Sequence, residues 1–173
     1  MHAEKITPEH KDFHTIKMLY MHSFPEEELL PYEFLYQNES SLYGFYDHGF
    51  CGFASFIRYE DLLNITFFAV TGTRRHQGYG SRILQIIHNH FPHHRITVDI
   101  ESPLVPSENT SQRQQRLQFY LHNGFKVSEV RYIFNHVTYD VLVLGDAFTY
   151  EDYDAFWHHF YPSYHRVSPQ IFK

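Results

Sequence analysis

Cysteine is nearly absent from this chain of 173 residues. The single cysteine, Cys51, cannot form a disulfide within the chain, which excludes a small secreted scaffold held together by disulfides. No stretch approaches the roughly 18 consecutive apolar residues of a membrane span. The opening residues, MHAEK, lack the apolar core of a signal peptide. From these absences we expect a cytoplasmic protein that does not bind membranes.

Positive charge is also scarce, because 14 Lys and Arg stand against 20 Asp and Glu, for a formal net charge of −6. Nucleic acids and anionic lipid surfaces are bound through clustered positive charge, so we expect no nucleic acid partner. Internal repeats, low-complexity tracts and Gly/Ser-rich linkers are missing as well. The sequence therefore predicts a single domain spanning residues 1–173.

Apolar and aromatic side chains are abundant, at 43% and 18% of the residues, which is enough for a sizeable core and excludes a disordered chain. Apolar spacings of three or four residues predict helices, and aromatic-rich or alternating runs predict strands. The predicted helices cover residues 12–22, 78–91, 111–122 and 150–160, with one or two short helices within 26–38. The predicted strands cover residues 41–46, 50–59, 63–70, 95–101, 125–134 and 137–144. This order predicts an α/β domain with a mixed sheet.

The turn after the third predicted strand carries the strongest chemical signal. It holds Arg75, Gly78 and Gly80 and leads directly into a predicted helix. The unpaired backbone N–H groups at a helix N-terminus attract phosphates, and glycine lets a phosphate approach the backbone closely. Arg74 and Arg82 add positive charge around the same turn. The sequence therefore predicts a phosphate-binding loop.

Two common phosphate-binding motifs do not match this loop. The nucleotide P-loop needs Lys-Ser/Thr after its last glycine, whereas Gly80 is followed by Ser81 and Arg82. The dinucleotide fingerprint needs a small residue three places after Gly80, where Ile83 stands. The pattern Arg-x-x-Gly-x-Gly at residues 75–80 instead resembles the acyl-CoA-binding motif of the GNAT superfamily of N-acetyltransferases.

Other segments strengthen this resemblance. The string FYLHNGF at residues 119–125, about forty residues downstream, resembles a later motif of the family, and the triplet GFA at residues 52–54 is also similar. Residues 98–103 resemble a bacterial branch. The resemblance covers a core of about residues 10–145 and leaves a C-terminal helical tail, 146–173. It implies the GNAT fold, a central mixed and mostly antiparallel sheet of six to seven strands flanked by helices, classed as α/β or, in some schemes, α+β.

The resemblance implies an enzyme that uses acetyl-CoA as co-substrate and no metal. A primary amine of the acceptor would attack the thioester directly in a ternary complex. In the family, backbone amides of the loop hold the pyrophosphate and amides at the end of the preceding strand polarise the thioester carbonyl, where negative charge develops. The implied coenzyme-binding residues are Phe68, Ala69, Val70, Arg75, His76, Gln77, Gly78, Tyr79, Gly80 and Ser81.

The candidate catalytic residues match the family pattern less closely than the loop does. Tyr120 stands at the family's general-acid position, where it would protonate the departing thiolate. Many members carry a glutamate base four residues before the Val70 position, and this chain has Thr66 there. Glu101, with Asp99 on the same face of its predicted strand, is our substitute for that base.

Several alternatives stay open at this point. Thr66, together with Arg113 in place of a family asparagine, also fits an acyl-CoA-binding sensor or interaction module with little catalysis. A nucleotide-binding α/β domain is disfavoured by the missing Lys-Ser/Thr pair. Tyr120 also fits a purely packing role, and Glu101 fits a cap of the loop before Pro103.

The negative charge of the chain is the only indication of which acceptor it uses. The net negative charge and the acidic segment at residues 26–33 favour a cationic amine, either a small molecule or a peptide amine. A homodimer is compatible with the aromatic side chains of the C-terminal segment, such as Phe156, Trp157 and Phe160, if they are exposed.

Histidine is abundant, with 15 residues, but its spacing matches no metal site. His88 and His90 are two apart on a predicted helix, so their side chains diverge by roughly 200°. With His93 and His94 they predict a solvated helix end and not a metal centre.

Overall fold

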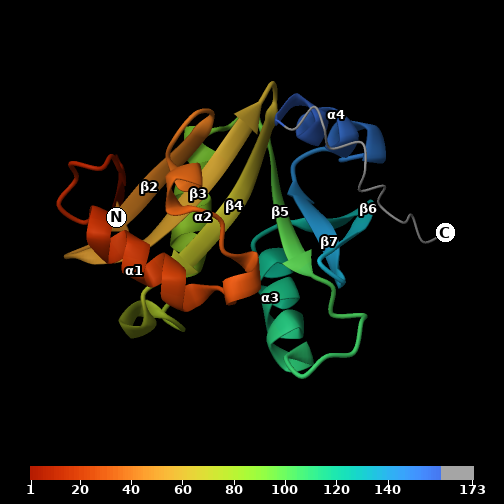
Figure 1. The fold of residues 1–173 in the computed structure, drawn as a ribbon, viewed down its shortest axis with the longest axis horizontal. Helices are drawn as coiled ribbons and strands as arrows, with labels where there is room; N and C mark the ends of the chain where they lie inside the picture. Colours follow the sequence, from red (N-terminus) through yellow and green to blue (C-terminus); the bar gives the residue numbers. More distant parts are fainter. Residues whose placement is uncertain (161–173) are drawn as a thin grey trace. The chain divides into compact units, whose positions relative to one another are not determined.

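The structure, a computed structural model, describes residues 1–160 of the chain, except the side chain of residue 27. The chain divides into two compact units (Figure 1). Unit 1 comprises Met1–Arg58 and Leu63–His93, and unit 2 comprises Tyr59–Leu62 and, within the described residues, 94–160.

Unit 1 contains most of four strands and two helices. The strands are β1 (His2–Lys5), β2 (Ser40–Tyr46), β3 (Phe50–Tyr59) and β4 (Leu62–Val70), and the helices are α1 (Phe13–Ser23) and α2 (Tyr79–His90). Short 3-10 helices cover Glu26–Glu28, Tyr32–Leu35 and Gly72–Arg74. The strands lie in the order β1-β2-β3-β4, and both β1 and β3 pair with β2 in antiparallel register.

Unit 2 contains three strands and two helices. The strands are β5 (Arg95–Glu101), β6 (Lys126–Phe134) and β7 (Val137–Leu144), and the helices are α3 (Thr110–His122) and α4 (Tyr150–Phe160). β7 lies between β5 and β6 and is antiparallel to both, with Glu101 opposite Tyr139 and Tyr139 opposite Tyr132. Opposite residues share a face of the sheet, so these three side chains lie on one face.

The predicted fold class is confirmed, because within residues 1–160 the seven strands belong to one sheet and four α-helices are interspersed among them along the chain. Every predicted helix and strand is present, with boundaries that agree or differ by one residue. β1 is the strand that the sequence pattern missed. It has four residues and exposes three of them, so it shows no apolar alternation, and it is held by backbone pairing with β2.

The core of unit 1 is largely aromatic. Ile16 and Tyr20, four residues apart on α1, are buried together with Phe53 of β3 and Phe67 of β4. The Tyr20 ring meets the edge of Phe67 with 4.9 Å between ring centroids. This spacing on α1 is the reason that a helix of modest amphipathicity stays on the sheet.

β3 and β4 approach each other unusually closely near the end of β4. A Cβ atom added at Gly52 would lie 2.4 Å from the backbone oxygen of Ala69. The Thr71 N–H then donates to the Cys51 carbonyl oxygen at 2.9 Å, beyond the last residue of β4. Gly52 is therefore required by backbone packing. Cys51 itself is fully buried, as expected for a packing residue.

α4 in unit 2 begins with reciprocal capping between two side chains. The Thr149 N–H donates to Asp152 Oδ2 at 2.9 Å, and the Asp152 N–H donates to Thr149 Oγ1 at 3.3 Å. This is the arrangement of a capping box, with Asp in place of the usual Glu. Arg95 also donates to Asp152, at 2.8 Å, and to Asp61, at 2.7 Å, so one guanidinium joins three segments of unit 2.

The expectation that the aromatic residues of α4 are exposed is wrong for Phe156, which is 3% exposed. Its ring packs against Tyr59 and Trp157 within unit 2. Phe156 lies three residues after the buried Tyr153, so the two share the inner stripe of an amphipathic helix. This packing removes part of the basis for the expected homodimer. Among the helices of residues 1–160, none combines the length and the apolar character needed to cross a bilayer.

Candidate functional site

The loop between β4 and α2 has the backbone geometry of an anion site. Gly78 occupies the N-cap position of α2 with φ of +78°, and His76 also has a positive φ, of +59°. Gly78 is exposed, and a Cβ added to it would meet no atom of the described chain within 4 Å. The position therefore needs glycine because its backbone is left-handed, and not because a side chain would lack space.

The first turn of α2 presents backbone N–H groups that no side chain caps. The first amide bonded within the helix is that of Arg82, which donates to the Gly78 carbonyl at 3.1 Å. The amides of Tyr79, Gly80 and Ser81 precede it and have no acceptor within the helix. Aligned peptide dipoles make this end positive, so the turn can bind a phosphate.

Two arginine side chains next to this turn pack against the ring of Tyr79. The Arg74 and Arg82 guanidinium carbons lie 5.0 Å and 5.1 Å from the ring centroid, and Arg74 also donates to the Tyr79 hydroxyl at 2.9 Å. Arg75 is exposed, and its Nε donates to the Val70 carbonyl at 3.1 Å. The predicted loop residues and their basic neighbours are thus brought together within unit 1.

Asp47 is a member of this site that sequence reasoning missed. It lies in the turn between β2 and β3, and its Oδ2 accepts a hydrogen bond from Arg82 at 2.8 Å. The Arg82 guanidinium lowers the pKa of the Asp47 carboxyl, so the carboxylate stays ionised at neutral pH. Asp47 and Arg82 are 35 residues apart, and only the hairpin geometry brings them together, so the sequence held no signal for the pair.

The end of β4 supplies the other part of the predicted coenzyme site. Thr66, Phe68 and Val70 are half-buried on one face, whereas Phe67 and Ala69 are buried on the other. The Thr66 hydroxyl donates to Asn64 Oδ1 at 3.2 Å. A threonine hydroxyl is not a base near neutral pH, so Thr66 does not supply the proton acceptor that its position has in many relatives.

Tyr120, the predicted general acid, lies on α3 in unit 2 and is 7% exposed. Burial raises its pKa to about 12, and the negative charge of Asp99 adds to this rise. Its ring packs against Phe119 and Phe125, and its hydroxyl makes no hydrogen bond with any residue of the described part of the chain. Tyr120 therefore keeps its proton across the physiological pH range.

Glu101, the predicted base, is held by two arginines of α3. Its Oε1 accepts from Arg113 at 2.7 Å and its Oε2 accepts from Arg116 at 3.2 Å and from Asn109 at 3.3 Å. Glu101 and Arg113 are each 7% exposed. These contacts occupy the carboxylate lone pairs that a base would use, and they make Glu101 an anchor of the loop that leads into α3.

Asp99, which precedes Glu101 on the same face of β5, is half-buried and accepts a hydrogen bond from the Tyr132 hydroxyl at 2.8 Å. At the histidine-rich end of α2, His88, His90 and His93 are exposed, as predicted for a solvated helix end. Across residues 1–160, no group of three or more His, Cys, Asp or Glu side chains is arranged to hold a metal ion.

Comparisons with known proteins identify the fold. No protein-family model matches the chain, and no curated protein matches it in sequence. Solved structures do match it. A protein from Bacteroides thetaiotaomicron assigned to the GNAT family of acetyltransferases has a TM-score of 0.77 at 20% identity, covering 92% of this chain and 95% of that one.

Two further matches carry named activities. An aminoglycoside 6'-N-acetyltransferase complexed with coenzyme A has a TM-score of 0.64 at 16% identity, covering 83% of this chain and 96% of that one. The ribosomal-protein-S18-alanine N-acetyltransferase from Escherichia coli has a TM-score of 0.60 at 13% identity, covering 87% and 98%. The chain therefore has the GNAT fold, and the resemblance found in its sequence is confirmed at the level of the fold.

Proposed function

We propose that this protein transfers an acetyl group from acetyl-CoA to an amine. The observation that carries the proposal is the turn between β4 and α2, with a left-handed Gly78 and an uncapped helix N-terminus. Arg74 and Arg82 add positive charge beside it. A coenzyme with a pyrophosphate suits this turn, because oriented N–H groups and fixed positive charge both favour a dianionic ligand. The same loop carries, at residues 75–80, the Arg-x-x-Gly-x-Gly pattern that resembles the acyl-CoA motif.

An amine acceptor is named for three of the solved structures that this chain resembles. Their names specify an aminoglycoside, the alanine of a ribosomal protein and spermidine as acceptors. In each of these acceptors the nucleophile is nitrogen. For this chain we propose the same class of nucleophile, a primary amine. Its net charge of −6 favours an acceptor that is cationic before it loses its proton.

In the proposed reaction, the amine nitrogen bonds to the thioester carbon and the carbon–sulfur bond breaks. The amine loses one proton, and the departing thiolate takes one up. Tyr120 is our candidate for the proton donor, because its raised pKa of about 12 keeps it protonated. A phenol of that pKa transfers its proton to a thiolate only as the bond breaks, so we assign it to the collapse of the tetrahedral intermediate.

Glu101 is our candidate for the base, and its carboxylate also accepts hydrogen bonds from two arginines and Asn109. Those contacts support a second candidate function, an acyl-CoA-binding protein with little catalysis. Thr66, with its hydroxyl bonded to Asn64, favours the same alternative.

The first experiment is a thermal shift with acetyl-CoA, CoA and ATP. A ligand present at about 100 times its Kd stabilises the native state by about 2.7 kcal/mol, which is a shift of several degrees. We expect stabilisation by acetyl-CoA and CoA and none by ATP. If no CoA species stabilises the protein, the turn is not a coenzyme site and both candidate functions fail.

Turnover then separates the two functions. Thiol release from acetyl-CoA is measured with a panel of amines for the wild type, Tyr120→Phe and Glu101→Gln. We expect Tyr120→Phe to lower kcat by roughly 10²–10⁴-fold, the usual contribution of a general acid. Its melting temperature should change little, because the ring contacts with Phe119 and Phe125 are retained. Stabilisation by CoA without thiol release from any amine would support the binding module.

A further inference from the structure

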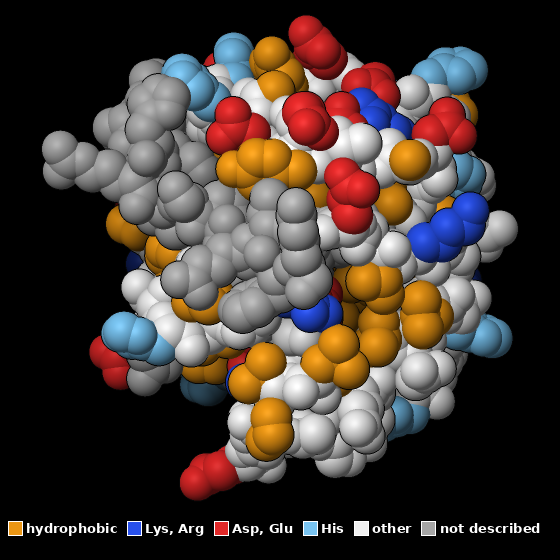
Figure 2. Space-filling model, turned by 90° about the vertical axis from the view of Figure 1, so that its right-hand side faces the viewer, with side chains coloured by type: hydrophobic (Ala, Val, Ile, Leu, Met, Phe, Trp, Pro, Cys, Tyr) orange, Lys and Arg blue, Asp and Glu red, His pale blue; other side chains and the backbone are white. Residues whose placement is uncertain are grey.

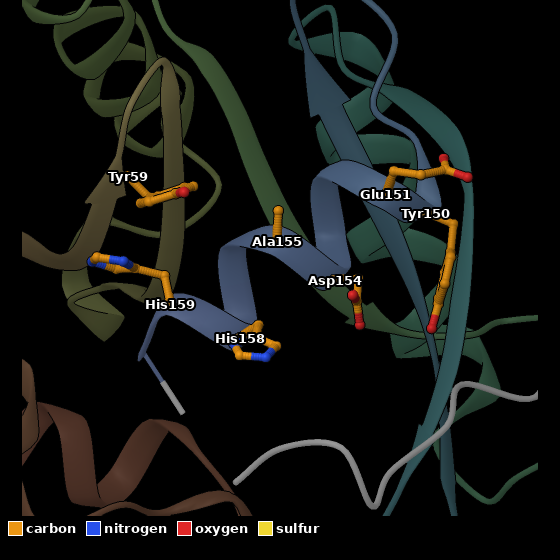
Figure 3. Close-up of a pocket in the computed structure, with 7 residues that line it drawn as sticks. All are labelled: Tyr59, Tyr150, Glu151, Asp154, Ala155, His158 and His159. Atoms are coloured by element: carbon orange, nitrogen blue, oxygen red, sulfur yellow. The ribbon is translucent and has the colours of Figure 1, made fainter. Parts of the chain in front are cut away.

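Exposed carboxylates of this protein lie where contact with water accounts for them. Figure 2 shows acidic side chains on one face of the molecule. On α4, Glu151 and Asp154 are exposed beside a hollow of about 520 Å³, which Figure 3 shows. Asp47 differs from them, because its side chain is only 20% exposed and accepts a hydrogen bond from Arg82. Its negative charge lies beside the proposed phosphate site and opposes an anionic ligand there, so its presence calls for a reason.

The turn that carries Asp47 is joined by its backbone to residues 71–82, which connect β4 to the first turn of α2 and which we call the coenzyme turn. The register of β2 and β3 shifts between Phe45 and Tyr46, so Cys51 has no residue of β2 opposite it. Such a β-bulge bends its strand and re-aims the groups beside it. The Cys51 carbonyl oxygen accepts a hydrogen bond from the Thr71 N–H at 2.9 Å, at the first residue of the coenzyme turn. The tip of the β2–β3 hairpin is thus fixed to the coenzyme turn within unit 1.

Asp47 adds contacts with two arginines of the coenzyme turn. Its Oδ2 accepts a hydrogen bond from Arg82 Nη1 at 2.8 Å, and its backbone carbonyl oxygen accepts one from Arg74 Nη2 at 3.3 Å. The same two guanidinium groups lie against the ring of Tyr79, with their carbon atoms 5.0 Å and 5.1 Å from the ring centroid. One residue of the hairpin and one ring of α2 therefore fix both arginines.

This arrangement orders side chains that would otherwise be mobile. The Arg82 side chain is 46% exposed, and an arginine at such a surface position samples many rotamers unless a partner holds it. A ligand that has to order such a side chain loses affinity, whereas a side chain ordered in the free protein adds no such cost. Two guanidinium groups against one carboxylate still leave net positive charge at the coenzyme turn. Asp47 thus gives up some attraction for an anion and gains order in the groups that bind it.

We propose that Asp47 is a positioning residue of the coenzyme site, which holds the Arg82 side chain in place for the phosphates of acetyl-CoA. Its backbone carbonyl does the same for Arg74. This inference rests on the proposed function and deepens it, because it names a residue that determines how tightly the coenzyme binds. In this role Asp47 does not touch the ligand and acts through Arg82.

Calorimetric titration with acetyl-CoA tests this role, because positioning and charge predict opposite changes in the Kd. Loss of a negative charge beside an anion site would by itself tighten binding. Loss of the acceptor that orders Arg82 would weaken binding. We expect Asp47→Ala to raise the Kd roughly tenfold. Asp47→Asn keeps an oxygen acceptor at the same position and should keep the Kd within about threefold of the wild type.

A matched control removes the same charge elsewhere. Glu9 is an exposed residue of unit 1 that makes none of these contacts, so Glu9→Ala should leave the Kd unchanged. Melting curves without ligand check that each variant is folded. If Asp47→Ala does not fold, Asp47→Ser replaces it, because the serine hydroxyl is too short to reach Arg82. The proposal is overturned if removal of the acceptor leaves binding as tight as in the wild type or tighter, or if that variant and Asp47→Asn bind equally.

A double-variant cycle tests whether Asp47 acts through Arg82. Arg82→Ala should itself raise the Kd, since it removes positive charge from the coenzyme turn. If Asp47 acts by holding Arg82, the double variant Asp47→Ala/Arg82→Ala should bind no more weakly than Arg82→Ala alone. Equal losses from Asp47→Ala in the presence and absence of Arg82 would also overturn the proposal.

The same titrations separate this inference from the proposed function. If the wild type binds acetyl-CoA and the Asp47 variants bind it equally well, the positioning role fails and the proposed function stands. If the wild type does not bind any CoA species, the coenzyme site itself fails, and the positioning role fails with it.

Discussion

The conformation of the turn between β4 and α2 rests on one backbone torsion, the φ of +78° at Gly78. This left-handed conformation costs free energy for residues with a Cβ atom, whereas glycine adopts it without that cost. The exposed side of Gly78 is open, so the residue gives the amides of the first turn their direction without packing against anything. A substitution here therefore changes a backbone preference and no described side-chain contact.

We predict that Gly78→Ala destabilises the protein by about 1–2 kcal/mol, the cost of a left-handed alanine. It should also weaken acetyl-CoA binding, because the strained turn re-aims the amides of α2. Urea unfolding and a titration with acetyl-CoA measure the two effects. Gly72→Ala is the matched control, since Gly72 lies in the same loop, has no positive φ and has equal space for a Cβ. Equal behaviour of the two variants would contradict the assigned role of Gly78.

Residues of the candidate site differed in how far the sequence could predict them. Gly78 and Gly80 follow from a local rule, because a turn that opens a helix needs glycine and exposed amides. Asp47 does not, because its contact with Arg82 depends on a hairpin far away in the chain. For Glu101, the strand position was predicted correctly, whereas its partners Arg113 and Arg116 come from the helix that follows.

At the scale of single elements, α4 depends on a guanidinium outside it. Arg95 of β5 donates to Asp61 of the β3–β4 turn, to Asp152 of α4 and to the Ala147 carbonyl at 2.9 Å. The Arg95 guanidinium lowers the pKa of both carboxyls. The start of α4 is thus fixed to its unit by charge-assisted hydrogen bonds, which are stronger than those between neutral groups.

We predict that Arg95→Ala lowers the free energy of unfolding by about 1–3 kcal/mol, because it leaves the half-buried Asp152 carboxylate without its donor. Chemical denaturation followed by circular dichroism measures the change. Arg58→Ala removes an exposed arginine of β3 that takes no part in these hydrogen bonds, and it should change stability by less than about 0.5 kcal/mol. Similar losses for both variants would mean that loss of an arginine, and not loss of the clamp, determines the effect.

The predicted elements were correct wherever apolar residues repeat. α2 buries Ile83, Leu84 and Ile87, a helical spacing that is visible in the sequence. β5 alternates Ile96, Val98 and Ile100 and has the bounds that were predicted for it. β1 was missed because backbone hydrogen bonds to β2 hold it, and such bonds leave no trace in side-chain type.

At the scale of the whole molecule, buried tyrosines link stability to alkaline pH. Burial raises the pKa of Tyr120 to about 12, and it also raises the pKa of Tyr20 and Tyr132. In the unfolded chain these phenols lose their protons near pH 10. The unfolded state therefore binds fewer protons than the native state above that pH.

We predict that these tyrosines leave the free energy of unfolding unchanged between about pH 7 and pH 10 and lower it as the pH rises toward about 12. Urea unfolding curves at increasing pH, followed together with tyrosinate absorbance, measure this dependence. Tyr120→Phe removes one of the contributing groups and should show a smaller loss over the same window. A wild-type stability that stays level through this window would show that the phenols ionise equally easily in both states.

The one tryptophan of the chain, Trp157, lies in α4 and packs against Tyr153 and Phe156, all within unit 2. Its fluorescence is therefore a natural local probe, since it reports the melting of unit 2 and carries no direct signal from unit 1. Circular dichroism, by contrast, averages over the helices of both units. Coincident melting curves from the two signals would make the units one cooperative folding unit, and separated curves would give each its own transition.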